Sequence, residues 1–239
     1  MNPNLSRGHG LADSASLATL KVDVIADLAC PWCWLGKRRL DDALLAVRGP
    51  SQVRWYPLLV NPGLPEDGMT FAEYLEARCG DPEHVEQRLE ELTLAGRAEG
   101  IDFRFDRLTR MPATVDAHRL LKLAEAEGMR VSAVAETLFR GCFEEGLNLG
   151  DREILVDLGR RCGLPPTSIR RTLADTSTRQ LVLSQDRQIR KSGLCGVPNF
   201  LVNKRLFVIG AQSTEALVNV FDRAMFGEES ARPVSSVLH

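Results

Sequence analysis

The sequence lacks any apolar run that approaches the roughly 18 residues of a transmembrane helix, so we expect no membrane partner. Residues 1–20 are polar and small, and they lack the apolar stretch of about 7–15 residues that a secretory signal contains. We expect these residues, like residues 228–239, to form a flexible tail. The protein is then expected to stay in the cytoplasm.

An excess of charge of either sign is also missing. Lys and Arg number 30 against 32 Asp and Glu, which gives a formal net charge of −2. A chain without a positive surplus has no electrostatic means of attracting nucleic acid, so we expect no nucleic-acid partner. The 239 residues, 44% of them hydrophobic, suffice for one domain with a large insertion or for two modest domains.

Potential metal ligands are few and poorly spaced. The six cysteines include a single CxxC pair, and the four histidines are scattered at positions 9, 84, 118 and 239. A structural zinc site usually needs a second CxxC pair, or regularly spaced histidines beside the first. We therefore expect no metal site, and in a reducing cytoplasm we expect no static disulfide framework.

The most informative feature present is the tetrad Cys30-Pro31-Trp32-Cys33, which lies between a predicted strand at 21–26 and a predicted helix at 34–47. A thiol at a helix start lies near about half a positive charge from the helix dipole, which favours the thiolate that attacks disulfides. We therefore assign Cys30 as the nucleophile and Cys33 as the more buried resolving thiol. Pro31 suits the first helical turn, and Trp32 either covers the site or contacts a partner.

Hydrophobic periodicity predicts the element order β-α-β, then a helical block, then β-β-α. A second strand is expected at 52–58, strands at 197–202 and 205–209 form a predicted hairpin, and a last helix starts at Ser213. We divide the chain into a first half at 21–66, a helical insertion at 67–193 and a second half at 194–227. On the helix after the tetrad, Lys37 and Arg38 are expected to face solvent.

Four strings give the sequence a resemblance to a known family. They are Asp27-Leu28-Ala29-Cys30-Pro31-Trp32-Cys33-Trp34-Leu35-Gly36-Lys37, Asp116-Ala117-His118-Arg119-Leu120, Gly196-Val197-Pro198 and Gly210-Ala211-Gln212. In this order, over about residues 21–227, they resemble the FrnE-like group of DsbA-family oxidoreductases. The resemblance implies an α/β thioredoxin fold with a large all-helical insertion, as in DsbA, and a cis peptide bond that places Pro198 against the two sulfurs. Val197 would then be free to pair with an extended partner backbone.

Several residues in or near these strings have two interpretations. Asp27 either carries a proton for Cys33 or caps the end of a strand, and His118 either faces the sulfurs and the substrate or is bonded locally. Cys195 and Asn199 stand where a serine and a bulky apolar residue are common in the family. Cys195 is then a buried spectator or a third redox-active thiol, and Asn199 is expected to make the surface beside the site more polar. The other cysteines, at 79, 142 and 162, are expected to be inert packing residues.

The leading interpretation is a thiol–disulfide oxidoreductase that cycles Cys30 and Cys33 between dithiol and disulfide, with no metal or organic cofactor. Its partners would be protein or small-molecule thiols and disulfides, and glutathione is a candidate co-substrate. A related branch, the 2-hydroxychromene-2-carboxylate isomerases and kappa-class glutathione transferases, has serine at the first tetrad position and uses glutathione. The alternative is therefore a glutathione-dependent isomerase or transferase acting on a small aromatic compound. A third class, a non-catalytic binding module, is disfavoured by the intact cysteine pair.

Overall fold

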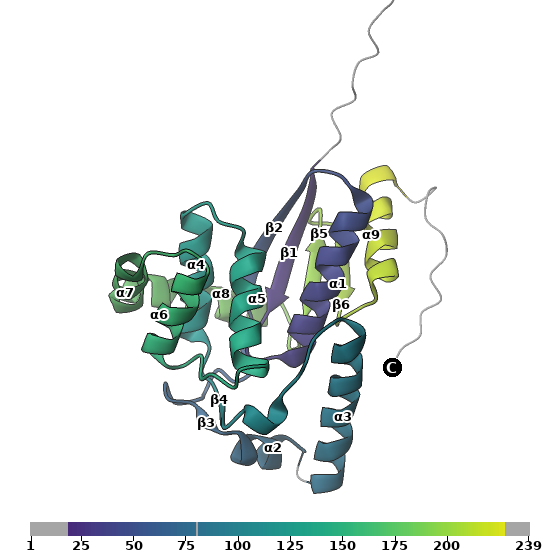
Figure 1. Ribbon diagram of the computed structural model, residues 1–239. Helices are drawn as coiled ribbons and strands as arrows, with labels where there is room; N and C mark the ends of the chain where they lie inside the picture. The colour runs from purple at the N-terminus through teal and green to yellow at the C-terminus, as the bar shows by residue number, and fades with distance from the viewer. Residues whose placement is uncertain (1–18, 80, 228–239) are drawn as a thin grey trace, which may run out of the picture.

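A four-stranded sheet organises the fold, and its strands lie in the order β2-β1-β5-β6. The computed structural model describes residues 19–79 and 81–227 (Figure 1). The strands are β1 (Leu20–Ala26), β2 (Ser51–Pro57), β5 (Asn199–Val202) and β6 (Leu206–Ile209). Strands β1 and β2 are parallel, whereas β5 runs antiparallel to both β1 and β6. The two halves of the predicted frame thus meet in one sheet, although about 140 residues separate β2 from β5 along the chain.

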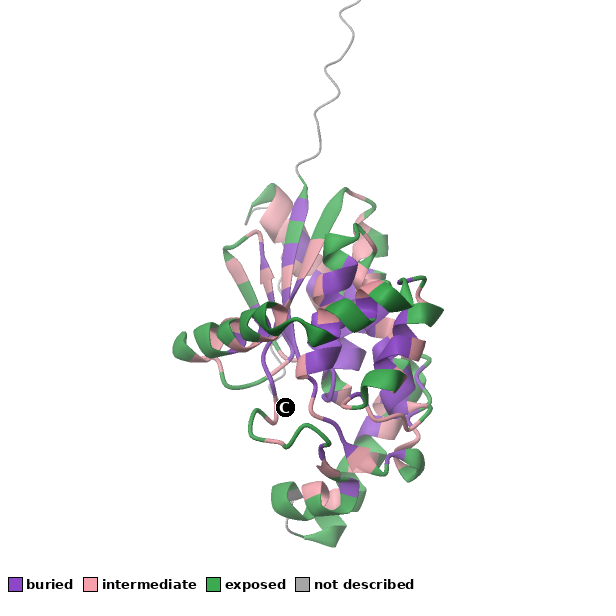
Figure 2. Ribbon diagram, turned by 90° about the vertical axis from the view of Figure 1, so that its left-hand side faces the viewer, coloured by how far each residue is buried: buried purple, intermediate pink, exposed green. Residues whose placement is uncertain are grey.

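Two helices, α1 (Pro31–Val47) and α9 (Thr214–Phe226), pack side by side against this sheet (Figure 1). In β1 the side chains of Leu20, Val22 and Val24 are buried, while Lys21 between them is exposed. This alternation is what a strand with one buried face requires. Figure 2 shows that the buried residues gather in the strands and in the helices beside them. The thioredoxin fold expected from the sequence is therefore confirmed, and β1 begins at Leu20, one residue inside the expected tail.

Seven helices lie between β2 and β5. They are α2 (Phe71–Cys79), α3 (Pro82–Ala98), α4 (Val115–Ala126), α5 (Val131–Phe143), α6 (Arg152–Arg161), α7 (Pro166–Ala174) and α8 (Thr176–Lys191). Aspartates at 81, 151 and 175 cap three of them by accepting backbone N–H groups, which explains why these helices begin where they do.

Two strands of two residues each, β3 (Met69–Thr70) and β4 (Arg110–Met111), pair antiparallel within this helical segment. The sequence predicted neither, because two residues are too few to show an alternating pattern. A 3-10 turn at Phe105–Arg107 precedes β4. The boundaries of the proposed insertion at 67 and 193 remain a prediction, and residues 1–18 and 228–239 of the expected tails lie outside the described residues.

The prediction that Lys37 faces solvent is wrong. Lys37 is only 3% exposed, and its ammonium lies 2.8 Å from Glu136 on α5 and 2.7 Å from Asp41. Arg38, also expected to face solvent, is only partly exposed and bonds the same Glu136 carboxylate across 2.6 Å. The helical segment covers this polar side of α1, and charged residues at these positions gave no sign in the sequence that another helix packs on them.

Candidate active site

The first tetrad cysteine is positioned by the junction of β1 and α1. Cys30 is the N-cap residue of α1, with extended backbone angles, and Pro31 occupies the first helical turn. The backbone N–H of Cys33 donates to the carbonyl oxygen of Cys30 across 3.0 Å, which closes the tetrad into one turn. Cys30 is 8% exposed and Cys33 is 1% exposed, so the first sulfur is the one a substrate reaches more easily. The positive end of the α1 dipole lies at this first sulfur.

The second cysteine is enclosed by protein. Burial, followed by the hydrogen bond to Cys30 and the proximity of that group, raises the pKa of the Cys33 thiol well above its usual range. The backbone N–H of Asp27 donates to Cys33 Sγ across 3.5 Å, a contact that favours the thiolate. A thiol with a raised pKa needs a proton acceptor before it can attack.

Asp27 supplies a carboxylate beside this buried thiol. Its oxygens accept hydrogen bonds from Thr114 Oγ1 and from the backbone N–H of Val60, each at 2.6 Å, and Oδ1 lies 3.3 Å from His118 Nε2. Burial alone would raise the pKa of Asp27, but the hydrogen bond and charge of His118, with the bonds from Thr114 and Val60, lower it below its ordinary value. Asp27 is therefore an ionised group fixed behind the tetrad, just after β1, and Thr114 and His118 reach it from the helical segment.

His118 lies in this polar cluster rather than in a surface cleft. Its residue is 3% exposed, and helix α4 brings it from the helical segment to the end of β1. A histidine bonded only locally was one of the two interpretations from the sequence, but the partner of His118 is Asp27, which is 91 positions away. Whether His118 faces a substrate remains a prediction. A direct contact between His118 and a substrate would require the site to open.

The loop before β5 packs on α1 close to the tetrad. The Val197–Pro198 peptide bond is cis, Pro198 is buried, and its carbonyl accepts the N–H of Gly210 across 2.8 Å. A Cβ placed on Gly36 would lie 3.0 Å from Pro198 Cγ and 3.2 Å from Cζ of Phe200. Any larger residue at position 36, three residues after Cys33, would require Pro198 and Phe200 to move by a few tenths of an ångström.

A cavity of about 620 Å³ opens in front of Cys30. Pro31 and Trp32 line it beside Cys30, and Trp32 is 41% exposed. The remaining lining is largely apolar and comes from α2, α3, the segment that follows them and the end of α5, including Phe71, Tyr74, Leu89, Leu92, Phe105, Met111 and Phe143. Sequence reasoning missed this lining, because it comes from separate helices that carry no shared motif.

Two arginines add positive charge to this cavity. Arg78 donates to the carbonyl of Val60 and to the side chain of Asn61, and its guanidinium lies 5.8 Å from the Tyr74 ring centre. Arg88 on α3 also lines the cavity. Val197 and Pro198 are not among its lining residues, so their contact with the sulfurs or with a substrate remains a prediction.

Two expectations about the loop at 194–199 are corrected. Cys195 is exposed, so it is not the buried spectator that was expected. Asn199 is 2% exposed and donates to the carbonyl of Gly196 across 2.5 Å, so its amide stabilises the loop instead of making the surface more polar. The side chain at 199 turns inward because this position of β5 pairs with Ile25 of β1.

The other described cysteines occupy packing positions. Cys142 is fully buried and burial raises the pKa of its thiol, whereas Cys162 is half-buried. The side chain of Cys79 lies outside the described part of the structure. Within residues 19–79 and 81–227 there is no group of three or more potential metal ligands, and no helix is long and apolar enough to span a membrane.

Comparison with known proteins gives a consistent result. The sequence model of the DSBA-like thioredoxin domain matches residues 21–222. A probable DsbA oxidoreductase from Streptomyces coelicolor is 30% identical, with a TM-score of 0.77 over 91% of this chain and 94% of that one. The cytosolic disulfide reductase DsbM from Pseudomonas aeruginosa, solved with glutathione, is 20% identical, with a TM-score of 0.59 over 86% of this chain and 95% of that one.

The 2-hydroxychromene-2-carboxylate isomerase shares the fold as well. It is 12% identical, with a TM-score of 0.63 over 85% of this chain and 95% of the isomerase. The frame of this chain is thus found both in disulfide oxidoreductases and in an isomerase, and the residues of the site must distinguish between these activities.

Proposed function

This chain belongs to the DSBA-like thioredoxin domain family, and we propose that it is a thiol–disulfide oxidoreductase that cycles Cys30 and Cys33 between dithiol and disulfide. The observation that supports this most is the unequal exposure of the two thiols at the start of α1, 8% for Cys30 and 1% for Cys33. A reachable nucleophile and an enclosed resolving thiol are what a two-step exchange requires.

In the first step the Cys30 thiolate attacks one sulfur of a substrate disulfide. The substrate S–S bond breaks, a mixed disulfide with Cys30 forms, and the other substrate sulfur leaves as a thiolate that takes up a proton. In the second step the Cys33 thiolate attacks Cys30 Sγ and releases the remaining substrate thiol. The substrate disulfide is reduced and the enzyme dithiol is oxidised to a disulfide, and the reverse sequence oxidises a substrate dithiol.

Asp27 is the proton carrier for Cys33 in this mechanism. The backbone N–H of Asp27 bonds Cys33 Sγ across 3.5 Å. The carboxylate of Asp27 is held ionised by Thr114, His118 and Val60. His118 acts as a positioning residue, because its contact with Asp27 Oδ1 fixes the carboxylate. The charge of Asp27 raises the pKa of Cys33, and this proximity supports the proton-carrying role of Asp27 over a strand cap.

Substrates approach through the cavity in front of Cys30. Trp32 and Pro31 contact them there, and Val197 and Pro198 complete the site from the loop that packs on Gly36. The substrates are protein or small-molecule thiols and disulfides in the cytoplasm, and the exchange itself needs no metal or organic cofactor.

The test is disulfide reduction or oxidation by purified wild-type protein and by Cys30→Ser and Cys33→Ser variants. We expect the Cys30 variant to be inactive, and full activity in that variant would refute the mechanism. A measured reduction potential gives the direction of electron flow: about −120 mV marks an oxidant of the DsbA type, and about −270 mV a reductant of the thioredoxin type.

A glutathione-dependent isomerase or transferase is the alternative. Arg78 and Arg88 favour it, because they line the cavity and suit the carboxylates of glutathione. Such an activity needs no resolving thiol, so it would survive Cys33→Ser, whereas cyclic disulfide exchange would not.

A further inference from the structure

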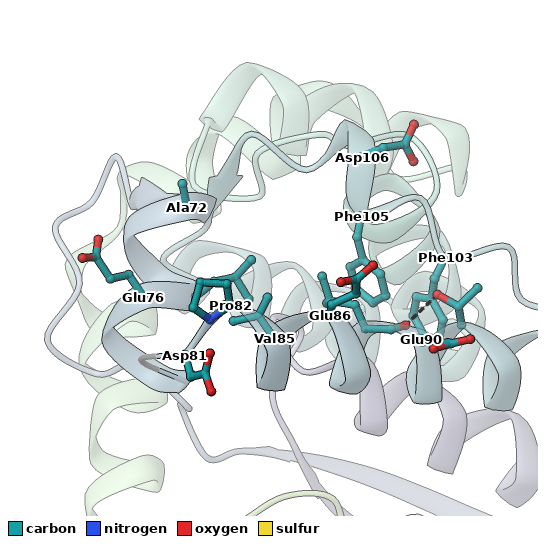
Figure 3. Close-up of a pocket in the computed structure, with 13 residues that line it drawn as sticks. Ala72, Glu76, Asp81, Pro82, Val85, Glu86, Glu90, Phe103, Phe105 and Asp106 are labelled. Atoms are coloured by element: carbon teal, nitrogen blue, oxygen red, sulfur yellow. Dashed lines mark hydrogen bonds between the residues drawn. The ribbon is translucent and has the colours of Figure 1, made fainter.

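A second cavity lies beside the Cys30 cavity and contains neither tetrad sulfur. It has a volume of about 850 Å³ and lies between α2, α3 and the segment at residues 103–106 (Figure 3). Its apolar lining includes Leu75, Val85, Leu89 and Phe105. These same four side chains also line the Cys30 cavity, so they form an apolar wall with one cavity on each side. A ligand in this second cavity, here called the acidic groove, is thus separated from the Cys30 cavity by one layer of side chains.

The polar lining of the acidic groove is strongly negative. Its carboxylates are Glu76 on α2, Asp81, Glu86 and Glu90 at and along α3, and Asp106, and no Lys or Arg lines it (Figure 3). Asp81 and Asp106 already have side-chain partners in His84 and Arg104. Among the described residues, the remaining three carboxylates take part in no hydrogen bond or ion pair, and all three residues are exposed. The groove therefore offers unpaired negative charge around an apolar floor.

The charge of this groove is opposite to that of the neighbouring cavity. Arg78, Arg88 and Glu91 line the Cys30 cavity, which leaves it one formal positive charge in excess. Glu76, Glu86 and Glu90 line the far side of the shared wall, where no Lys or Arg lines the groove. Lysine and arginine side chains have long apolar stems and a charged end, so they suit a surface with an apolar floor and an acidic edge. A polypeptide with basic residues next to an aliphatic or aromatic residue matches both features at once.

We propose that the acidic groove binds a basic segment, containing an apolar side chain, of the protein substrate whose thiol or disulfide reacts at Cys30. This inference rests on the proposed oxidoreductase function and adds the substrate class. The opposite charges on the two sides of the wall would orient the substrate, with its basic segment on α3 and its reacting sulfur at the start of α1.

Peptide binding tests the groove without any redox step. The probe is a fluorescent, cysteine-free peptide, Lys-Phe-Lys-Leu-Lys, compared with a peptide that has Glu in place of each Lys. We expect the basic peptide to bind more tightly, and its binding to weaken when salt rises from about 0.1 M to about 1 M, which shortens the Debye length from about 10 Å to about 3 Å. The double variant Glu86→Gln, Glu90→Gln should weaken binding roughly three- to tenfold, as the loss of two exposed ion pairs predicts.

A matched control removes the same charge elsewhere. Glu83 and Glu127 are exposed and line neither cavity, so the double variant Glu83→Gln, Glu127→Gln should bind like wild type. Equal binding of the two peptides, or equal loss in both double variants, would overturn the proposal. Spermine and unlabelled basic peptide are then compared as competitors of the fluorescent peptide. If spermine competes equally well, the ligand is a small polycation, and the proposal is overturned.

Turnover connects the groove to Cys30. Each peptide is extended by one cysteine, which is held in a mixed disulfide, and is used as a substrate. A small uncharged disulfide is the reference substrate, assayed separately. In the double variant Glu86→Gln, Glu90→Gln, kcat/KM for the basic peptide should fall by the factor seen in binding, while the small disulfide reacts as in wild type. If wild type reacts with none of these disulfides, the oxidoreductase function fails, and the binding data still decide the groove. If it reacts with all of them and shows no preference for the basic peptide, the substrate class is wrong and the function stands.

Discussion

The backbone N–H of Asp27 donates to the sulfur of Cys33, so the residue with the buried carboxylate is tied directly to the resolving thiol. Its carboxylate is held in turn by Thr114 and His118 from the helical segment. The acid–base part of the site therefore depends on contact between the end of β1 and the helical segment. Its contribution to the rate can be measured separately from that of the two sulfurs.

Replacement of Asp27 by Asn should slow the second step of exchange. General acid–base assistance is typically worth roughly a hundredfold or more, so we expect a loss of about that size in single-turnover release from the mixed disulfide. In wild type the carboxylate stays ionised well below neutral pH, because its pKa is lowered. In the variant the rate should instead keep rising into the alkaline range, until Cys33, whose pKa is raised, ionises unaided.

Asp27→Asn should also shift the pKa of Cys33, in the direction that favours its thiolate. The charge of Asp27 raises the pKa of Cys33, so Asp27→Asn should lower that pKa while it slows the reaction. Asp42→Asn is the control, because this exposed aspartate on α1 lies outside the cluster. An unchanged pH profile for the Asp27 variant would remove the proton-carrying role.

Cys33→Ser should accumulate mixed disulfides through Cys30. Without the resolving sulfur the first adduct has no internal route to release, and Cys30 is the more accessible of the two tetrad residues. Non-reducing electrophoresis with mass spectrometry after exposure to a model disulfide checks this. Cys30→Ser is the matched control, and adducts of similar or greater yield in that variant would contradict the assignment of Cys30 as the attacking thiol.

Gly36→Ala should destabilise the protein and reduce its activity. The new methyl group would lie 3.0 Å from Pro198 and 3.2 Å from Phe200, and overpacking of this kind costs about 1–3 kcal/mol. Alanine gains about 1 kcal/mol in helix propensity, so we expect the free energy of unfolding to fall by up to about 2 kcal/mol. Gly63→Ala, where no atom lies within 4 Å of the new Cβ, should leave both properties near wild type. Denaturant unfolding of both variants would show whether the close approach at position 36 matters.

Cys195 should remain a free thiol when the protein is oxidised. It is exposed, so an alkylating reagent should label it in the native protein, whereas the fully buried Cys142 should react only after unfolding. Peptide mapping of the oxidised protein is expected to find a single Cys30–Cys33 bridge. A substantial linkage from Cys195 to either tetrad cysteine would make it a third redox-active thiol.

Local signals in the sequence predicted a large part of this structure. The β-α-β and β-β-α halves follow from apolar periodicity, and the helix starts after Asp81 and Asp151 follow from capping side chains. The position of the tetrad at a helix start could be predicted because neighbouring residues alone create that environment, and the roles of Cys30 and Cys33 remain predictions.

Other features depend on contacts between distant parts of the chain. The pairing of Asp27 with His118, the burial of Lys37 and the inward turn of Asn199 arise only when the helical segment and the sheet pack together. Strands β3 and β4 are too short to leave a pattern, and the acidic groove is formed by side chains on α2, α3 and the segment at 103–106. Patterns within short stretches of sequence cannot show that these distant residues lie side by side.

The ion pairs at Glu136 bear on how this enzyme can be shortened. This glutamate on α5 accepts hydrogen bonds from the Trp34 indole and from Arg38, and it lies 2.8 Å from the ammonium of Lys37. If the helical segment were excised to leave a minimal sheet with α1 and α9, Lys37 would lose Glu136 but would be exposed to water and would keep Asp41, which lies 2.7 Å away, so its charge would stay solvated and paired. The excised frame would, however, expose the fully buried Trp34 one position after the tetrad. The rings that cover Trp34 are Phe103, Phe139 and Phe143 of the helical segment, so a minimal version of this protein needs a polar residue at position 34.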